Sequence, residues 1–276
     1  MTEQNTMRAA VVQLQVGDDV ETNIATAIDL VRQAAADGAD IVVLPEMVDF
    51  RGEREQVPSI KTDIPGPVSS RFADTARDLG IWLLAGSIHE NIPDRDHTYN
   101  TSLLFNREGA EVARYRKLHL YDVQIPGRVD ALESATIAPG ADVVTANMEG
   151  HTAGLSICYD IRFPELYRAL ANEGAELVFL PAMFMMFTGK DHWEVLIRAR
   201  AIENQCFMLA SGQHGADRKG VATYGRSMIV DPWGTVLATV PDGDGYALAT
   251  LDFDSLRRIR KELPSLANRR RDVLGS

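Results

Sequence analysis

Short apolar runs alternate with helical segments along the chain, a pattern typical of an α/β fold. Residues 8–16 are predicted to form a strand, and residues 23–36 place their apolar positions on one side of a helix that Gly38 would end. Residues 41–44 are apolar throughout, as expected for a strand covered on both faces. The remaining apolar runs predict strands at 81–87, 101–106, 153–157, 207–211, 227–230 and 247–252, and helices at 166–172 and 193–204.

One stretch of sequence occurs twice. Residues 38–45 read GADIVVLP and residues 174–181 read GAELVFLP, and each copy follows a helical segment. The repeat indicates two similar halves, and hence two sheets packed face to face with helices outside. A chance match between two generic helix–strand units is the alternative. Only the first copy is followed by a carboxylate, Glu46, because Ala182 takes that place in the second.

Composition narrows the class of protein. The 276 residues are 45% hydrophobic and carry a formal net charge of −11. Such a chain is long enough to bury a core. Its negative charge repels nucleic acids, and the short basic cluster at 269–271 is too small to reverse that repulsion. No apolar stretch approaches the roughly 20 residues that cross a bilayer, and residues 1–5 lack the pattern of a secretory signal. We therefore expect a cytoplasmic protein without nucleic-acid or membrane partners.

The chain contains only two cysteines, Cys158 and Cys206, and no cysteine–histidine group with metal-site spacing. We therefore expect no metal and no cofactor. Cys158 ends the predicted strand 153–157, just before a helix expected to start near Pro164. A cysteine in such a turn is exposed at the carboxyl edge of the sheet, where backbone N–H groups favour a thiolate. Cys206 lies in a helix-to-strand run and is expected to pack in the core.

A nucleophilic cysteine needs a base, usually a histidine. His119 and His192 are placed where they could serve, but they could equally be structural. The other four histidines are expected in polar loops: His89, His97, His151 and His214. Glu46 is a sharper candidate because it follows a strand and a proline, and because burial raises the pKa of a carboxyl toward neutrality. A solvated loop carboxylate is the alternative for Glu46.

Lys117 stands in the aromatic and aliphatic segment 115–122. A lysine there is unusual unless its ammonium meets an anion, and it could stabilise both a Cys158 thiolate and the oxyanion of a tetrahedral intermediate. Taken alone, Lys117 could also be a surface side chain with a solvated head.

Three segments together resemble the signature regions of the nitrilase superfamily. They are LPE at 44–46, YRKLHL at 115–120 and ICYDIRFPE at 157–165, in the family's order. The resemblance runs from about Met7 to Arg271. It implies a single carbon–nitrogen hydrolase domain over 7–271, folded as a four-layer αββα sandwich that assembles into homodimers or larger homo-oligomers.

The same resemblance implies the roles of individual residues. Glu46 would be the general base, Lys117 the oxyanion-stabilising lysine, Cys158 the nucleophile and Glu133 an auxiliary glutamate. The backbone N–H of Tyr159 would join Lys117 at the oxyanion. The reaction expected is cysteine-dependent hydrolysis of the amide of a small carboxylate-bearing substrate through a thioester, with release of ammonia.

Within the superfamily, the segments 123–127, 188–194, 198–205 and 231–234 are most similar to deaminated glutathione amidases, followed by omega-amidases. Arg162 is a candidate to bind the substrate carboxylate, with a structural salt bridge as the alternative.

The stretch 182–187, AMFMMF, departs from these relatives, which usually have small residues there. It is expected to border the pocket through Met183 and Phe184, together with Thr188 that follows it, and to make the pocket narrower or more apolar. Extra core packing is the alternative for this stretch.

Two other readings remain open from the residues alone. A nitrilase or an N-carbamoyl amidase would use the same three groups, since all three substrates present an electrophilic carbon bound to nitrogen. A catalytically silent scaffold or a redox sensor would keep the fold, but it predicts damage to at least one of Glu46, Lys117 and Cys158, and all three are present.

Overall fold

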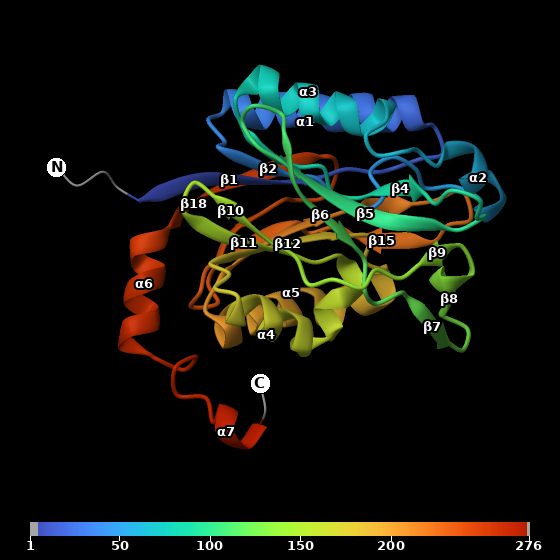
Figure 1. Cartoon of the computed structure of the whole chain (residues 1–276). Coiled ribbons are helices and arrows are strands. Elements are labelled where there is room, and N and C mark those ends of the chain that lie inside the picture. The colour runs from blue at the N-terminus through green and yellow to red at the C-terminus, as the bar shows by residue number, and fades with distance from the viewer. Residues whose placement is uncertain (1–4, 275–276) are drawn as a thin grey trace.

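Four layers are stacked in the computed structural model, which describes residues 5–274 (Figure 1). Two sheets pack face to face, and helices cover the outer face of each sheet. The predicted αββα sandwich is therefore confirmed. The polar segment 1–5, on which the absence of a signal was predicted, lies outside the described residues except for Asn5.

The first sheet has eight strands and carries two helices on its outer face. Its strands β1, β2 and β3 run parallel, and β18 pairs with β1 in the opposite direction. In spatial order the strands are β18 (Gly245–Asp252), β1 (Thr6–Gln13), β2 (Ile41–Val43), β3 (Trp82–Leu84), β5 (Thr98–Phe105) and β4 (Ile88–Asn91), with β6 (Glu111–Arg116) and β9 (Ile137–Ala138) paired to β5. The covering helices are α1 (Val20–Ala36) and α3 (Pro67–Leu79).

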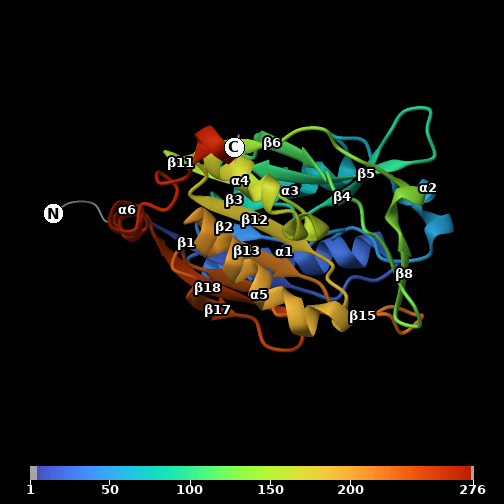
Figure 2. The ribbon, with the colours of Figure 1, turned by 90° about the horizontal axis from the view of Figure 1, so that it is seen from below.

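The second sheet has six strands, and α4 (Pro164–Asn172) and α5 (Met186–Asn204) cover it. In spatial order its strands are β10 (Thr145–Met148), β11 (His151–Leu155), β12 (Leu177–Ala182), β13 (Phe207–Gly212), β16 (Met228–Val230) and β17 (Val236–Thr239). Figure 2 shows both helices lying across this sheet.

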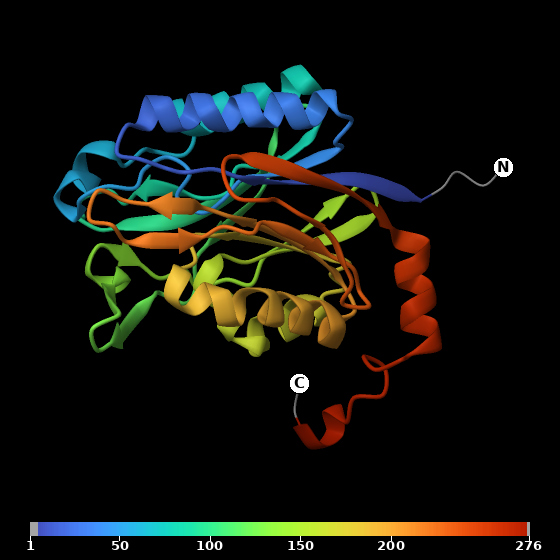
Figure 3. The same ribbon diagram turned by 180° about the vertical axis from the view of Figure 1, so that it is seen from behind.

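Two hairpins and several short helices complete the chain. The hairpins are β7 (Asp122–Ile125) with β8 (Val129–Leu132), and β14 (His214–Ala216) with β15 (Ala222–Tyr224); they lie at the same end of the sandwich as α2 (Figure 3). The remaining helices are α2 (Val57–Ile60), α6 (Phe253–Glu262), α7 (Arg271–Leu274) and the 3₁₀ turns η1 (Arg54–Gln56), η2 (Glu133–Ala135) and η3 (Cys158–Arg162).

Strand β1 shows why the central strands are apolar on both faces. Ala10 and Val12 pack in the core beneath α1, whereas Ala9 and Val11 face the second sheet. Alternate side chains point to opposite faces of a strand, so a strand with a helix layer on one face and a sheet on the other needs apolar residues at every position. The two sheets are also joined by hydrogen bonds, since Ser211 and Ser227 donate to the carbonyl of Val12.

The repeated stretch forms corresponding elements in the two halves. Its first copy supplies β2, which pairs in parallel with β1, and its second copy supplies β12, which pairs in parallel with β11. The prediction of two similar halves is confirmed. Both copies of the repeat therefore direct the chain after their proline toward the same edge of the sandwich.

Helices α1 and α5 both start earlier than predicted. Helix α1 starts at Val20 because the side chain of Asp19 caps it, accepting a hydrogen bond of 2.7 Å from the Thr22 N–H. Helix α5 starts at Met186, so the prediction of a helix beginning only at residue 193 was wrong. Only residues 183–185 link β12 to α5, and the first turn of α5 buries Thr188 and Gly189, whereas Met186 and Phe187 are exposed.

Within residues 5–274, none of the helices combines the length and the apolar character that a membrane crossing requires.

Candidate active site

Glu46 is held by donors from distant parts of the chain. It lies just after β2 and is almost fully buried. Its carboxylate accepts hydrogen bonds from Lys117 Nζ at 2.8 Å, from Asn100 Nδ2 at 2.8 Å and from the backbone N–H of Met183 at 2.7 Å. The solvated loop carboxylate considered for Glu46 is therefore not what the structure shows.

The turn that carries Glu46 depends on a glycine. Gly86 has φ +60°, and a Cβ at this position would lie 1.9 Å from the carbonyl oxygen of Pro45. Only glycine permits this close approach of the two backbones. The neighbouring Ser87 then accepts a hydrogen bond of 2.9 Å from the Met47 N–H, which fixes the turn after Glu46.

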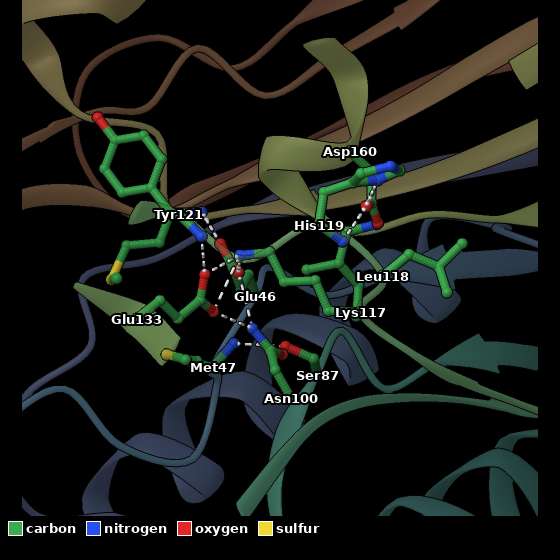
Figure 4. A network of polar contacts seen from close by, with 12 residues as sticks. Glu46, Met47, Ser87, Asn100, Lys117, Leu118, His119, Tyr121, Glu133 and Asp160 are labelled. Atoms are coloured by element: carbon green, nitrogen blue, oxygen red, sulfur yellow. Dashed lines mark hydrogen bonds and ion pairs between the residues drawn. The ribbon is translucent and has the colours of Figure 1, made fainter. Parts of the chain in front are cut away.

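Lys117 lies directly after β6 and is enclosed by two carboxylates (Figure 4). Its Nζ lies 2.8 Å from Glu46 Oε1 and 2.9 Å from Glu133 Oε2. Burial alone would lower the pKa of Lys117, but the negative charges of Glu133 and Glu46 outweigh it and raise this pKa well above its usual value. The side chain is therefore a fixed ammonium, and a solvated surface lysine is excluded.

Glu133 stands at the start of the 3₁₀ turn η2 and is partly buried. Besides Lys117, its carboxylate accepts a hydrogen bond of 2.6 Å from the backbone N–H of Tyr121 and a longer one of 3.3 Å from Asn100. The predicted auxiliary glutamate thus lies beside the ammonium and shares it with Glu46.

Cys158 occupies a strained position at the start of η3. Its φ is +46°, in the left-handed region that residues other than glycine rarely adopt. The chain passes from β11 through this turn into α4, which begins at Pro164 as predicted. A sharp turn of this kind aims the thiol out of the sheet edge, as the serine of a nucleophile elbow is aimed.

The Cys158 thiol lies close enough to the Glu46 carboxylate and to the Met183 N–H for both groups to act on its pKa. Burial raises the pKa of this thiol well above its usual value, the negative charge of Glu46 adds to the rise, and Lys117 opposes it. The Met183 N–H does lower this pKa, in the direction predicted for backbone N–H groups, but desolvation and Glu46 outweigh it. Cys158 is buried, not exposed as predicted. The resting group is a thiol that needs a base when it reacts.

Asp160 holds the nucleophile turn in place. Its carboxylate is fully buried and accepts hydrogen bonds from Tyr115 Oη at 2.7 Å and from the Ile157 N–H at 2.8 Å. His119 binds the same carboxylate through Nδ1 at 2.7 Å and stacks on Phe163. His119 is therefore a structural residue of the turn.

A narrow pocket, with a cavity volume of about 10 Å³, opens beside Cys158. All the residues predicted to bind the substrate line this pocket. Its lining consists of Tyr121, Cys158, Tyr159, Arg162, Met183, Phe184, Met185 and Thr188. Met186 and Phe187 instead face a separate surface hollow, so only the first part of the Met/Phe-rich stretch narrows the pocket.

Arg162 makes no ion pair with a carboxylate among residues 5–274. Its guanidinium lies 5.0 Å from the ring centre of Phe184 and 5.9 Å from that of Tyr159, and its Nη1 lies 3.3 Å from Nδ1 of His192. The alternative of a structural salt bridge is therefore not seen. A cation at the pocket wall without an anionic partner is free to meet an anionic ligand.

Three residues near the site were not found from the sequence. Asn100 donates to both Glu46 and Glu133, and it lies opposite His89 in the pairing of β4 with β5. His89, predicted in a polar loop, is instead buried on β4 and bonded to Asp49, with 3.0 Å between Nδ1 and Oδ1. Strand β5 is buried at nearly every position and begins before the predicted strand 101–106, so no alternating pattern pointed to Asn100, and nothing local paired His89 with Asp49.

Cys206 is buried, and burial raises the pKa of its thiol to about 12, consistent with a core residue. Among the described residues, no three His, Cys, Asp or Glu side chains are grouped so that they could hold a metal ion.

Residues 8–261 match the model of a protein family described as carbon-nitrogen hydrolase. The chain belongs to the carbon–nitrogen hydrolase family. The prediction of a hydrolase acting on carbon–nitrogen bonds is thereby confirmed. The match falls within the predicted single domain over 7–271, whose limits stay a prediction.

Known members of the family cover nearly the whole chain. Deaminated glutathione amidase from Homo sapiens is 42% identical over 273 residues, which are 97% of this chain and 83% of that protein. Omega-amidase from Mus musculus is 36% identical over 269 residues, covering 98% and 97%. The crystal structure of Saccharomyces cerevisiae Nit3, a member of branch 10 of the nitrilase superfamily, matches with a TM-score of 0.86 at 30% identity over 96% of each chain. The predicted membership of this superfamily and of its amidase branch is confirmed.

Proposed function

We propose that this carbon–nitrogen hydrolase cleaves the amide of a small 2-oxo acid such as deaminated glutathione, with Cys158 as the nucleophile. One observation carries the proposal: the Cys158 thiol, the Glu46 carboxylate and the Lys117 ammonium meet at a pocket whose wall holds the Arg162 cation. The first three groups supply a nucleophile, a base and an electrostatic stabiliser. The fourth suits a substrate that carries a carboxylate.

In the first half of the reaction, Glu46 accepts the thiol proton as the sulfur bonds to the amide carbon. The amide oxygen becomes an oxyanion beside the Lys117 ammonium and the backbone N–H of Tyr159. That N–H belongs to the first turn of η3, where helix N–H groups lack internal partners. When the carbon–nitrogen bond breaks, Glu46 returns its proton to the leaving nitrogen, and a thioester remains on Cys158.

In the second half, water replaces the departed amine. Glu46 takes a proton from the water as its oxygen bonds to the thioester carbon, and Glu133 keeps Lys117 in position at the oxyanion. Breaking the carbon–sulfur bond releases the acid, and the proton on Glu46 restores the Cys158 thiol. Each half requires only the three buried groups and the Tyr159 N–H.

The substrate class rests on the Arg162 cation and on the activity for which the human relative is named. Deaminated glutathione has a carboxylate for Arg162 and an N-substituted amide for Cys158. Its leaving group is cysteinylglycine, so an assay must detect an amine as well as the ammonia expected from an unsubstituted amide.

The test is hydrolysis of an amide panel by the wild type and by Cys158→Ala. The panel contains deaminated glutathione, 2-oxoglutaramate, glutamine, an aliphatic nitrile and an N-carbamoyl amino acid, with both ammonia and the free cysteinylglycine thiol as readouts. We expect turnover of the 2-oxo acid amides by the wild type and none by the variant. Equal turnover by both proteins, or a clear preference for the nitrile or the carbamoyl compound, would contradict the proposal.

Omega-amidase activity on 2-oxoglutaramate is the second candidate, favoured by the similarity to omega-amidase from Mus musculus. The narrow pocket beside Cys158 also favours a short substrate. The ratio of kcat/KM for 2-oxoglutaramate to that for deaminated glutathione decides between the two candidates.

We further propose that the protein acts in the cytoplasm as a homodimer or larger homo-oligomer. The support is an exposed apolar surface on the helical layer, where Ile202 of α5 packs beside Gly234 and Trp233 is 61% exposed. Light scattering after size exclusion should give a mass of at least two chains, and Trp233→Glu should reduce it. A wild-type mass of one chain would refute the proposal.

A further inference from the structure

Tyr121 lies between the charged cluster and the pocket. Its backbone N–H donates to Glu133 at 2.6 Å, and its ring meets the ring of Tyr159 edge-on with 5.0 Å between their centres. Figure 4 shows the ring extending away from the carboxylates of Glu133 and Glu46. The backbone of Tyr121 is therefore tied to the catalytic cluster, while its side chain lines the pocket beside Cys158.

The Tyr121 hydroxyl is buried and has no hydrogen-bond partner among residues 5–274. Burial raises the pKa of this phenol, Cys158 adds to the rise, and the Arg162 guanidinium opposes it. The phenol is thus neutral at physiological pH, keeps its proton to donate, and stands close to both the nucleophile and the guanidinium. A buried polar group without a partner is costly, and a ligand that supplies an acceptor would satisfy it.

The lining of the pocket offers no carboxylate to pair with a cationic ligand. None of its eight lining residues is a carboxylate, and Glu46 and Glu133 nearby are already paired with Lys117. Its wall instead offers a guanidinium and a phenolic O–H. The guanidinium only donates and the phenol can donate, so the two suit a ligand with two neighbouring acceptors. The positive charge of the guanidinium opposes a ligand with an ammonium group.

A 2-oxo acid carries such neighbouring acceptors, a carboxylate and a keto oxygen on adjacent carbons. We propose that the Tyr121 hydroxyl donates a hydrogen bond to the 2-oxo oxygen of the substrate while Arg162 binds the adjacent carboxylate, so that Tyr121 selects 2-oxo acid amides over their 2-amino counterparts. This inference rests on the proposed function, which it narrows to the 2-oxo group. The flexible side chains of Met183 and Met185 let the narrow pocket widen around the ligand.

The first test compares two amides that differ only in the 2-oxo group, 2-oxoglutaramate and glutaramate. For Tyr121→Phe, kcat/KM on 2-oxoglutaramate should fall about tenfold, as expected for one lost hydrogen bond, and that on glutaramate should stay the same. Tyr246→Phe is the matched control, because it removes a hydroxyl that binds Asp37 at the surface. Equal effects of Tyr121→Phe on both amides, or none on either, would overturn the inference.

The second test does not depend on turnover. In the Cys158→Ala background, calorimetry would compare the binding of 2-oxoglutarate and glutarate with Tyr121 intact and with Tyr121→Phe. We expect 2-oxoglutarate to bind about tenfold more tightly than glutarate only when the hydroxyl is present. The same ratio in both variants would overturn the inference. If the wild type hydrolyses neither amide, the proposed function fails, and this binding ratio still decides the role of Tyr121.

Discussion

The backbone N–H of Met183 donates a 2.7 Å hydrogen bond to the Glu46 carboxylate. Glu46 follows the first copy of the repeated stretch, and Met183 follows the second by one further residue. The two halves of the sandwich therefore meet at the active site, where one half supplies the carboxylate and the other supplies a backbone donor that orients it.

Replacing Glu46 by Gln should separate hydrolysis from thiol reactivity. Hydrolysis should fall by roughly 10²–10⁴-fold because the general base is lost. The pH midpoint for alkylation of Cys158 by iodoacetamide should move down, because the charge of Glu46 raises the pKa of that thiol. Mass spectrometry of the labelled peptides measures this, with buried Cys206 as the internal control. An unchanged or higher midpoint would mean that the charge of Glu46 does not act on Cys158.

Replacing Lys117 by Met should destabilise the fold as well as abolish activity. The change leaves the carboxylates of Glu46 and Glu133 without their shared cation in a site where Lys117 is only 2% exposed. Breaking a buried ion pair in this way costs about 3–5 kcal/mol. Urea denaturation at pH 7 measures the loss. Lys190→Met, which removes an exposed ion pair, is the control and should lower the free energy of unfolding by less than about 1 kcal/mol. A similarly small decrease for Lys117→Met would contradict the presence of a buried, paired ammonium.

The pair of His89 and Asp49 should make stability depend on pH. Burial would lower the pKa of His89, but the charge of Asp49 and its hydrogen bond outweigh burial and raise it above the usual 6.5. A raised folded-state pKa gives a contribution that is complete below pH 6.5 and is lost as pH rises through the folded value. The stability difference between the wild type and His89→Gln should therefore shrink as the pH rises from 6.5.

Urea denaturation across about pH 6.5–9 would measure this difference, because a histidine whose pKa is raised above 6.5 loses its proton in that range. Asp49→Asn should remove the same pH-dependent part, because the partner charge is gone. A stability difference that stays constant over the window would show that the His89 charge does not contribute.

Two glycines with similar backbone conformations should respond differently to alanine. Gly86 has φ +60° and a backbone oxygen 1.9 Å from the position of a Cβ, whereas Gly80 has φ +64° and no atom of the described residues within 4 Å of that position. Gly80→Ala should cost only the strain of the left-handed conformation, about 1–2 kcal/mol. Gly86→Ala should cost more in thermal denaturation and should lower kcat, because the turn that carries Glu46 must move. Equal costs for the two variants would show that the close approach at Gly86 is unimportant.

Much of the fold could be predicted from local patterns. The apolar strands and the helical spacing of α1 indicated a layered fold, because periodicity reports which face of an element is buried. The repeat before Glu46 and Ala182 indicated that the fold has two similar halves. The start of α5 could not be placed, since Met186 and Phe187 are compatible with a loop or a helix. Their state depends on how α5 packs on the second sheet.

The sequence predicted the principal residues of the candidate site but not the residues that support them. Glu46, Lys117 and Cys158 stood in recognisable segments, but Asn100 and the pair of His89 and Asp49 did not. The register of β4 against β5 places Asn100 opposite His89. That register is set by contacts along the whole sheet, so no short segment carries it.

The sequence by itself determined which residue types follow which strands, and thereby the two layered halves and the chemical groups available for reaction. Only the tertiary structure decided that the Lys117 ammonium lies 2.8 Å from Glu46 and that the thiol of Cys158 rests protonated. It also decided that the buried hydroxyl of Tyr121, a residue of the pocket lining, has no partner among residues 5–274. The physical reason is that distance and desolvation arise between segments far apart in the chain, and these two quantities set charge states and free hydrogen-bonding capacity.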